Sequence, residues 1–273
     1  MYKMDENNKI NGIDPLEENF DLFPIVKHIA FFLTGWLGLK IIALIVSRLT
    51  LLYYQSHNID LSLEANIKYA SAASVIMNVS SYLILVIALI AILGGKGIKV
   101  FLQQFKNENA IVDGLAYGGL LLLTGSAIGI ICTVLRGGNG SVNDNESAIR
   151  FMTKMYPLPL IIMTGIFAPF CEELTYRLGL YNVLRRKNRW LAYVVCALVF
   201  AFIHFTIPDT NSETFKAELI NEFWNLPSYI VSGLVLCRAY EKHQNIATSI
   251  IAHAVNNFVA IFSTIASAAL MVG

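Results

Sequence analysis

The chain has 273 residues, of which 56% are hydrophobic and only 14% charged, and its net charge is +1. Soluble proteins carry about 25% charged residues, and a soluble fold has too little interior to bury this much apolar side chain. The near-zero net charge offers no electrostatic basis for binding DNA or RNA. The composition therefore predicts a membrane protein and excludes a nucleic-acid partner.

The first segment, residues 1–24, is polar and contains six carboxylates. It lacks the basic, then apolar, then small-residue order of a cleavable signal peptide. We therefore expect the first membrane helix to remain in the mature protein. The expected organisation is this polar segment, then N-terminal membrane helices with an outer loop over residues 25–156, and then a second membrane unit over residues 157–273.

Long apolar runs follow the polar segment. An α-helix needs about 20 mostly apolar residues to cross a hydrocarbon core of about 30 Å, and these runs are too long and continuous for the strands of a membrane barrel. The sequence predicts an all-α, polytopic bundle of about seven transmembrane helices, with eight as the alternative, around a polar intramembrane cavity. The expected helices are Ile29–Tyr53, Ala70–Leu93, Ala110–Leu135, Leu158–Leu184, Trp190–Phe205, Asn225–Tyr240 and Ile246–Met271.

Two further patterns concern the connections and contacts of these helices. The segment Arg136–Met155 contains three glycines together with several Asn and Ser, so we expect an exposed, mobile outer loop. The third helix contains Gly114xxxGly118 and Gly125xxxGly129, a spacing that allows close approach of another helix. The spacing is common in apolar helices and carries no functional weight alone.

The distribution of Lys and Arg indicates the orientation in the membrane. With a cytoplasmic N-terminus, the cytoplasmic segments hold twelve Lys and Arg residues and the opposite side holds five. Cytoplasmic loops of membrane proteins are enriched in these residues. The sequence therefore predicts a multi-pass protein of the cell membrane with a cytoplasmic N-terminus and an outward C-terminus. The lack of organelle-targeting signals favours a bacterial source.

The predicted fourth helix carries ionisable residues, which cost at least a few kcal/mol each near the bilayer centre and often mark function. It contains Glu172, Glu173 and, four residues after Glu173, Arg177. This spacing places Glu173 and Arg177 on one helix face, where they can form a structural ion pair. Glu172 points about 100° away and has no cation nearby in the sequence, so it is a candidate general base.

Two other predicted helices supply histidines and amides. Phe200 and His204 share one face of the fifth helix, and His253 and Asn257 share one face of the seventh. Each has a structural alternative, since a histidine near a helix end often packs and an asparagine often joins helices. His28 and His243 fall at membrane borders, and we expect both to be solvated. Together, the carboxylate, the two intramembrane histidines and the amide can activate water and bind an oxyanion.

These motifs resemble those of a known family. Glu172-Glu173-x-x-x-Arg177, Phe200-x-x-x-His204 and His253-x-x-x-Asn257 occur in the order of the EExxxR, FxxxH and HxxxN motifs of the CPBP family, the CAAX protease and bacteriocin-processing membrane proteins. The three motifs fall within residues 157–271, whereas the N-terminal half has no recognisable motif. One departure is that Leu178 follows Arg177, where the family often has glycine.

The resemblance implies an intramembrane endopeptidase, similar to type II CAAX prenyl proteases, with a cavity open to the cytoplasm. It implies that Glu172 activates water with help from His204, that His253 and Asn257 bind the oxyanion, and that Glu173 and Arg177 support the site. Residues 157–273 would be the catalytic core. The implied partners are a peptide or membrane-protein substrate related to CAAX tails, bacteriocins or signal peptides, the lipid bilayer, and a regulatory membrane protein as a further partner.

Three alternatives remain. One is a zinc protease in which Glu172, His204 and His253 hold the metal, although the chain lacks the usual HExxH spacing; we otherwise expect no cofactor. The second is a membrane protein that binds a partner, or acts in immunity or regulation, without proteolysis. The third is a transporter that uses the buried carboxylate and histidines to relay protons, although the sequence lacks paired broken helices and repeated halves.

Overall fold

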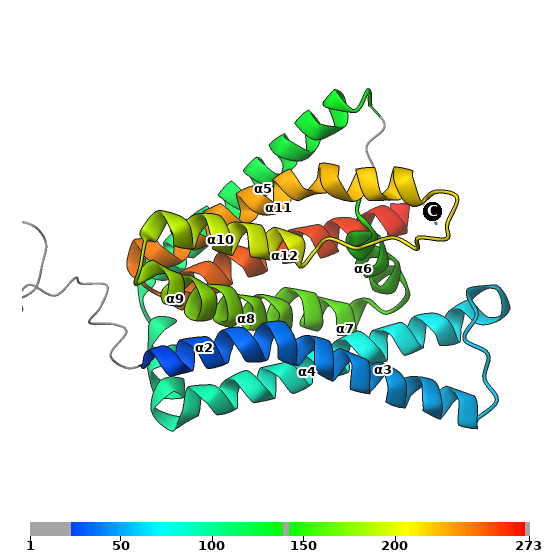
Figure 1. Ribbon diagram of the computed structural model, residues 1–273, viewed down its shortest axis with the longest axis horizontal. Coiled ribbons are helices and arrows are strands. Elements are labelled where there is room, and N and C mark those ends of the chain that lie inside the picture. Colours follow the sequence, from blue (N-terminus) through cyan, green and yellow to red (C-terminus); the bar gives the residue numbers. More distant parts are fainter. Residues whose placement is uncertain (1–22, 139–141, 271–273) are drawn as a thin grey trace, which may run out of the picture.

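A computed structural model describes residues 23–138 and 142–270, and all regular secondary structure in this part of the chain is helical (Figure 1). Three π-helical segments, labelled η, interrupt the α-helices, and α4 has non-helical backbone angles at Asn66 and Gly94. The elements are α2 (Ile25–Leu33), η1 (Thr34–Gly38), α3 (Leu39–Ser56), α4 (Leu63–Gln104), α5 (Glu108–Leu135), α6 (Asp144–Met155), α7 (Pro157–Ile162), η2 (Met163–Phe167), α8 (Ala168–Glu173), η3 (Leu174–Tyr181), α9 (Asn182–Arg185), α10 (Arg189–Phe202), α11 (Phe215–His243) and α12 (Ile246–Leu270).

The described elements form a polytopic bundle, which confirms the predicted fold class. Five helical segments are long and apolar enough to cross a membrane: Ile25–Ser56, Asn66–Gln104, Glu108–Leu135, Pro157–Arg185 and Ile246–Leu270. The other two predicted helices are present with different lengths. The fifth ends at Phe202 and is a shorter apolar helix. The sixth starts at Phe215 instead of Asn225. Hydropathy does not detect its first turns, because they are polar.

The prediction of an outer loop over Arg136–Met155 is wrong for most of this segment, because residues 144–155 form α6. The Asn143 side chain caps this helix by accepting a hydrogen bond from the backbone N–H of Glu146, at 2.8 Å. Asp144 and Glu146 lie in the first turn, where negative charge is favourable. Met152 is buried against the bundle. Residues 139–141 of the predicted loop lie outside the described residues.

Close contacts between small residues fix the position of α12. A Cβ atom on Gly114 would lie 2.9 Å from Ile251 Cβ, and one on Gly118 would lie 2.7 Å from Val255 Cβ. The Gly114xxxGly118 pattern therefore lets α5 lie directly against α12. A Cβ on Gly125 would meet nothing within 4 Å, so the second pattern has no such role.

The two ends of the bundle differ in character. Figure 1 shows α6 beside the start of α7, at the end of the bundle remote from α9. The end that contains α9 is packed with buried side chains, among them Leu89, Leu93, Tyr181, Tyr193, Tyr240 and Ile246. We call the region around α9, the α9–α10 turn and the α11–α12 turn the closed end.

Candidate active site

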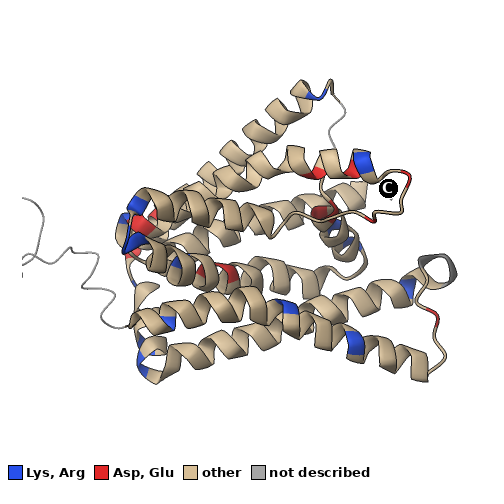
Figure 2. Cartoon of the chain, in the orientation of Figure 1, with Lys and Arg blue, Asp and Glu red and all other residues tan. Residues whose placement is uncertain are grey.

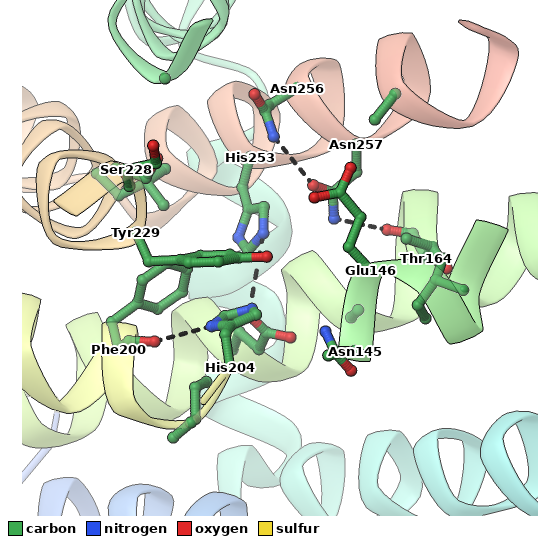
Figure 3. A pocket seen from close by; sticks show the side chains of 18 of the residues that line it. Asn145, Glu146, Thr164, Phe200, His204, Ser228, Tyr229, His253, Asn256 and Asn257 are labelled. Atoms are coloured by element: carbon green, nitrogen blue, oxygen red, sulfur yellow. Dashed lines mark hydrogen bonds and ion pairs between the residues drawn. The ribbon is translucent and has the colours of Figure 1, made fainter. Parts of the chain in front are cut away.

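A cavity of about 1390 Å³ lies between the helices, lined by residues of α4, α5, α6, α8, α10, α11 and α12 among others. The side chains of Glu172, His204, His253 and Asn257 all line it. Figure 3 shows His204 and His253 on neighbouring elements, with Asn257 one helical turn beyond His253. The structure therefore brings the four predicted catalytic residues, from three separate helical regions, to one cavity.

The local backbone around Glu172 is unusual. The short helix α8 lies between the π-helical segments η2 and η3. Such insertions are rare and are often found at functional sites. Glu172 lines the cavity with 12% of its side chain exposed, whereas the side chain of Glu173 is fully buried. Two adjacent carboxylates therefore occupy different environments.

The predicted ion pair between Glu173 and Arg177 is present. Arg177 Nη1 lies 2.9 Å from Glu173 Oε1, and both side chains are completely buried. Arg177 also donates a hydrogen bond to the carbonyl oxygen of Gly233, at 3.2 Å, and its guanidinium lies 4.6 Å from the centre of the Phe200 ring. The arginine therefore neutralises a buried carboxylate and ties η3 to α10 and α11.

His253 connects the two glutamates. Its Nδ1 lies 2.9 Å from Glu173 Oε1 and donates to that oxygen, because a carboxylate accepts. Its Nε2 lies 3.9 Å from Glu172 Oε2. Glu172, which has no cation nearby in the sequence, therefore has an imidazole beside it in space. With His253 protonated, the charges of Glu172, Glu173, Arg177 and His253 sum to zero.

His204 lies just beyond the end of α10 rather than inside it. Its Nδ1 lies 2.8 Å from the carbonyl oxygen of Phe200 and must carry a hydrogen to donate there. In the neutral ring this leaves Nε2 as an acceptor. The imidazole stacks on Tyr229 with ring centres 4.4 Å apart, and Asn143 Nδ2 donates to the His204 carbonyl oxygen, at 3.0 Å. The ring is thus fixed in position and tautomer.

Asn257 is oriented by two hydrogen bonds. Its Nδ2 donates to the carbonyl oxygen of Thr164 in η2, at 2.9 Å, and its Oδ1 accepts from Asn256 Nδ2, at 3.3 Å. An amide nitrogen has two hydrogens, so Nδ2 retains one donor after binding Thr164. This donor is available to a substrate in the cavity.

Three site residues escaped the sequence analysis: Tyr82, Asn143 and Tyr229. Tyr82 donates a hydrogen bond to Glu172 Oε1, at 3.2 Å. Tyr229 stacks on His204 and accepts from Asn143 Nδ2, at 3.2 Å. A signal existed for Tyr82, because Asn78 and Tyr82 are four residues apart in an apolar helix and both line the cavity. The other two act through contacts between distant segments, which spacing does not reveal.

One of the two expectations about the histidines at the membrane borders is wrong. His28 is completely buried rather than solvated, and its Nδ1 donates to the carbonyl oxygen of Leu178, at 2.5 Å. His243 keeps 22% of its side chain exposed and pairs with Asp113 of α5.

Leu178 and Gly179 stand where the sequence departs from the family pattern. A Cβ on Gly179 would lie 2.8 Å from the Phe32 backbone nitrogen, so this glycine lets α2 pack against η3.

The positions of the side chains that could bind zinc are relevant to the metalloprotease alternative. Among residues 23–138 and 142–270, no group of three or more His, Cys, Asp or Glu side chains is arranged to hold a metal ion. His253 uses Nδ1 for Glu173, and His204 uses Nδ1 for Phe200. The four cysteines are buried free thiols, and Cys171 is the one among them that lines the cavity.

A comparison with known protein families matches the segment of the chain that carries the candidate site. Residues 154–259 match the family model described as type II CAAX prenyl endopeptidase Rce1-like. This match confirms the family resemblance of the three motifs, and the segment contains all four predicted catalytic residues. The printed description of the matched family is that of an endopeptidase.

Two curated relatives come from Lactococcus lactis subsp. lactis. The UPF0177 protein YvdC is 22% identical over 134 residues, which cover 49% of this chain and 45% of the relative. The UPF0177 protein YbdI is 25% identical over 114 residues, which cover 41% of this chain and 54% of the relative. The matched part thus spans about half the length of either relative. No solved structure matches.

Proposed function

We propose that the chain is a multi-pass intramembrane endopeptidase that hydrolyses a peptide bond with water activated by Glu172 and His204. The observation that carries this proposal is the convergence of Glu172, His204, His253 and Asn257 on one cavity within the segment that matches the protease family. A carboxylate and a histidine beside two donors are the groups that amide hydrolysis needs.

Water activation is assigned to Glu172. Its Oε1 accepts from Tyr82, whereas Oε2 has no hydrogen-bond partner in the described part of the chain. Oε2 is thus able to take one proton from water, while His204 Nε2 accepts a hydrogen bond from the O–H that remains on the oxygen. The resulting hydroxide attacks the carbonyl carbon of the substrate. The protonated Glu172 then delivers its proton to the leaving nitrogen, and the C–N bond breaks.

Oxyanion stabilisation is assigned to His253 and Asn257. The Glu173 carboxylate accepts from His253 Nδ1 and orients the ring, and the imidazolium form has a second N–H at Nε2. This N–H and the remaining hydrogen of Asn257 Nδ2 donate to the oxyanion. Arg177 balances the charge of Glu173. Glu173 and Arg177 thus position the site without touching the substrate.

The substrate is a peptide or a segment of a membrane protein, of the CAAX, bacteriocin or signal-peptide type. The proposed location is the cell membrane of a bacterium, with a cytoplasmic N-terminus set by the twelve-to-five distribution of Lys and Arg. The proposed chemistry uses no metal. A regulatory membrane partner fits the same location.

The test is cleavage of a fluorogenic peptide panel, including prenylated CAAX and double-glycine leader peptides, by detergent-purified protein. Glu172→Gln keeps the size of the side chain and removes the base, so we expect kcat to fall about 10²–10⁴-fold with an unchanged thermal unfolding midpoint. Glu213→Gln, an exposed carboxylate outside the cavity, is the matched control and should cleave like the wild type.

The other outcomes discriminate the alternatives. Equal cleavage by wild type and Glu172→Gln would contradict the assignment of the base. Stoichiometric zinc in the active, purified protein would favour the metalloprotease. A folded wild type that cleaves no peptide, together with cellular function that survives replacement of all four cavity residues, would favour a non-proteolytic partner-binding or immunity protein.

A further inference from the structure

The cavity opens at one end of the bundle. On α10 its lining runs from Val195 to Phe205, beyond the end of the helix, and on α6 it includes Asn145 and Arg150, which are exposed. None of the described lining residues belongs to α9, the α9–α10 turn or the α11–α12 turn. The mouth of the cavity therefore lies beside α6, where α10 ends.

The closed end is sealed by a polar network as well as by apolar packing. Glu241 accepts hydrogen bonds from Tyr181 at 2.9 Å, Tyr193 at 2.6 Å and Arg189 at 2.7 Å. Its carboxylate is only 6% exposed. A substrate therefore has no route to Glu172 from this end without breaking the network.

Positive charge gathers at the closed end (Figure 2). In the described part of the chain the closed end has ten Lys and Arg residues: Lys27, Lys96, Lys99, Lys106, Arg185, Arg186, Lys187, Arg189, Arg238 and Lys242. The cavity end has five near the helix ends, Lys68, Arg136, Arg150, Lys154 and Lys216, and Arg48 lies about two turns inside α3 on the same half of the bundle. Short segments rich in Lys and Arg remain cytoplasmic, so the charge distribution places the closed end in the cytoplasm.

We propose that the catalytic cavity opens on the outer face of the membrane and takes a peptide segment presented on that face, an inference that rests on the proposed peptidase function. The family resemblance implied a cytoplasmic opening, and the charges of this chain point the other way. The substrate class is thus an exported peptide or the outer flank of a membrane protein. A prenylated tail of a cytoplasmic protein does not reach the mouth.

The charge and polarity of the cavity lining suit such a substrate. Glu146 and Arg150 pair with each other across 2.6 Å, so the α6 rim offers little net charge. Asn145, Ser228, Asn256 and Thr264 add uncharged polar groups to the lining. Backbone amides of an extended peptide hydrogen-bond to such groups without the need for a charged residue.

The first experiment tests orientation without using catalysis. Ser147→Cys places a thiol on an exposed position of α6, and Lys187→Cys places one on an exposed position of the α9–α10 turn. We expect a membrane-impermeant maleimide to label Ser147→Cys in intact cells at least ten times more than Lys187→Cys, with equal labelling after permeabilisation. The unsubstituted chain is the background control, because its four cysteines are buried. The reverse pattern overturns the proposal.

The second experiment tests the side from which substrate enters. Wild-type protein in right-side-out vesicles should cleave an impermeant fluorogenic peptide, whereas inside-out vesicles should do so only after detergent is added. Cleavage by intact inside-out vesicles alone would overturn the outward opening and leave the peptidase function standing. A lack of cleavage even in detergent would instead count against the peptidase function, and the labelling result would still decide the orientation.

Discussion

At the scale of single residues, the adjacent glutamates show how one motif separates two tasks. Glu173 is buried and accepts from both Arg177 and His253, whereas Glu172 keeps one carboxylate oxygen free of hydrogen bonds in the cavity. Spacing alone predicted the pair of Glu173 with Arg177, because four residues form one helical turn. Spacing could not predict that His253, eighty positions away, binds Glu173.

Breaking the buried ion pair should cost far more stability than breaking an exposed one. Arg177→Met leaves Glu173 buried with one partner fewer, and such changes cost about 3–5 kcal/mol. Arg150→Met breaks a pair of the same spacing whose side chains are 51% and 38% exposed, which is worth about 0.3–0.5 kcal/mol. Unfolding of both variants in detergent measures the difference. Equal losses would contradict the structural role of Arg177.

Removing one hydroxyl should impair catalysis without unfolding the protein. Tyr82→Phe deletes the hydrogen bond to Glu172 Oε1, a bond to a charged group worth about 1.5–3 kcal/mol, so kcat/KM should fall about ten-fold or more. Tyr117→Phe, outside the cavity lining, is the control and should cleave normally. The comparison uses the peptide panel at saturating and limiting substrate. Wild-type activity in Tyr82→Phe would remove this tyrosine from the site.

At the scale of elements, α6 shows where composition misleads. The glycines and polar residues of this segment predicted a loop, yet the Asn143 cap and the buried Met152 make residues 144–155 a helix. Glu222 of α11 also accepts from the backbone N–H groups of Asp144 and Thr206, at 3.0 Å each. Cap chemistry was visible in the sequence, but the contact with α11 was not, because it joins residues far apart along the chain.

The cap of α6 should affect catalysis as well as stability. Asn143→Ala removes an N-cap, which costs about 1 kcal/mol, and also the hydrogen bonds to the His204 carbonyl and to Tyr229. We expect faster hydrogen exchange in α6 and residues 203–207 and a several-fold lower kcat. Asn188→Ala removes the equivalent cap of α10 at the closed end. It should lose the cap contribution of about 1 kcal/mol and retain kcat. Equal activity losses in the two variants would contradict a positioning role.

At the scale of the whole molecule, hydropathy predicted the bundle because a bilayer imposes long apolar helices. It was less successful for α11, whose polar first turns carry Asn221 and Glu222. These residues hold Arg136 and the start of α6 through hydrogen bonds of 2.8 Å and 3.0 Å. The sequence also could not indicate where the cavity opens, since its mouth combines the ends of α5 and α10 with α6. The charge pattern decides orientation only after the ends of the bundle are known.

Shifting positive charge between the two ends should therefore change the orientation of the molecule. One variant loses four exposed cations at the closed end and gains two at the cavity end: Lys96→Gln, Lys99→Gln, Arg186→Gln, Lys187→Gln, Ser147→Lys and Thr210→Lys. The proposed distribution then changes from twelve against five to eight against seven, and orientation follows Lys and Arg rather than net charge. We expect a mixed population, with impermeant labelling of a thiol placed at Glu213 reduced to about half.

A control variant separates this effect from charge in general. Asp209→Asn and Glu218→Gln remove acidic residues from the cavity end, and carboxylates contribute little to orientation. Labelling at Glu213→Cys should stay complete in that background. If the variant with shifted cations also keeps complete labelling, the Lys and Arg distribution does not set the orientation. The outward opening of the cavity would then depend on the thiol labelling of the otherwise native chain alone.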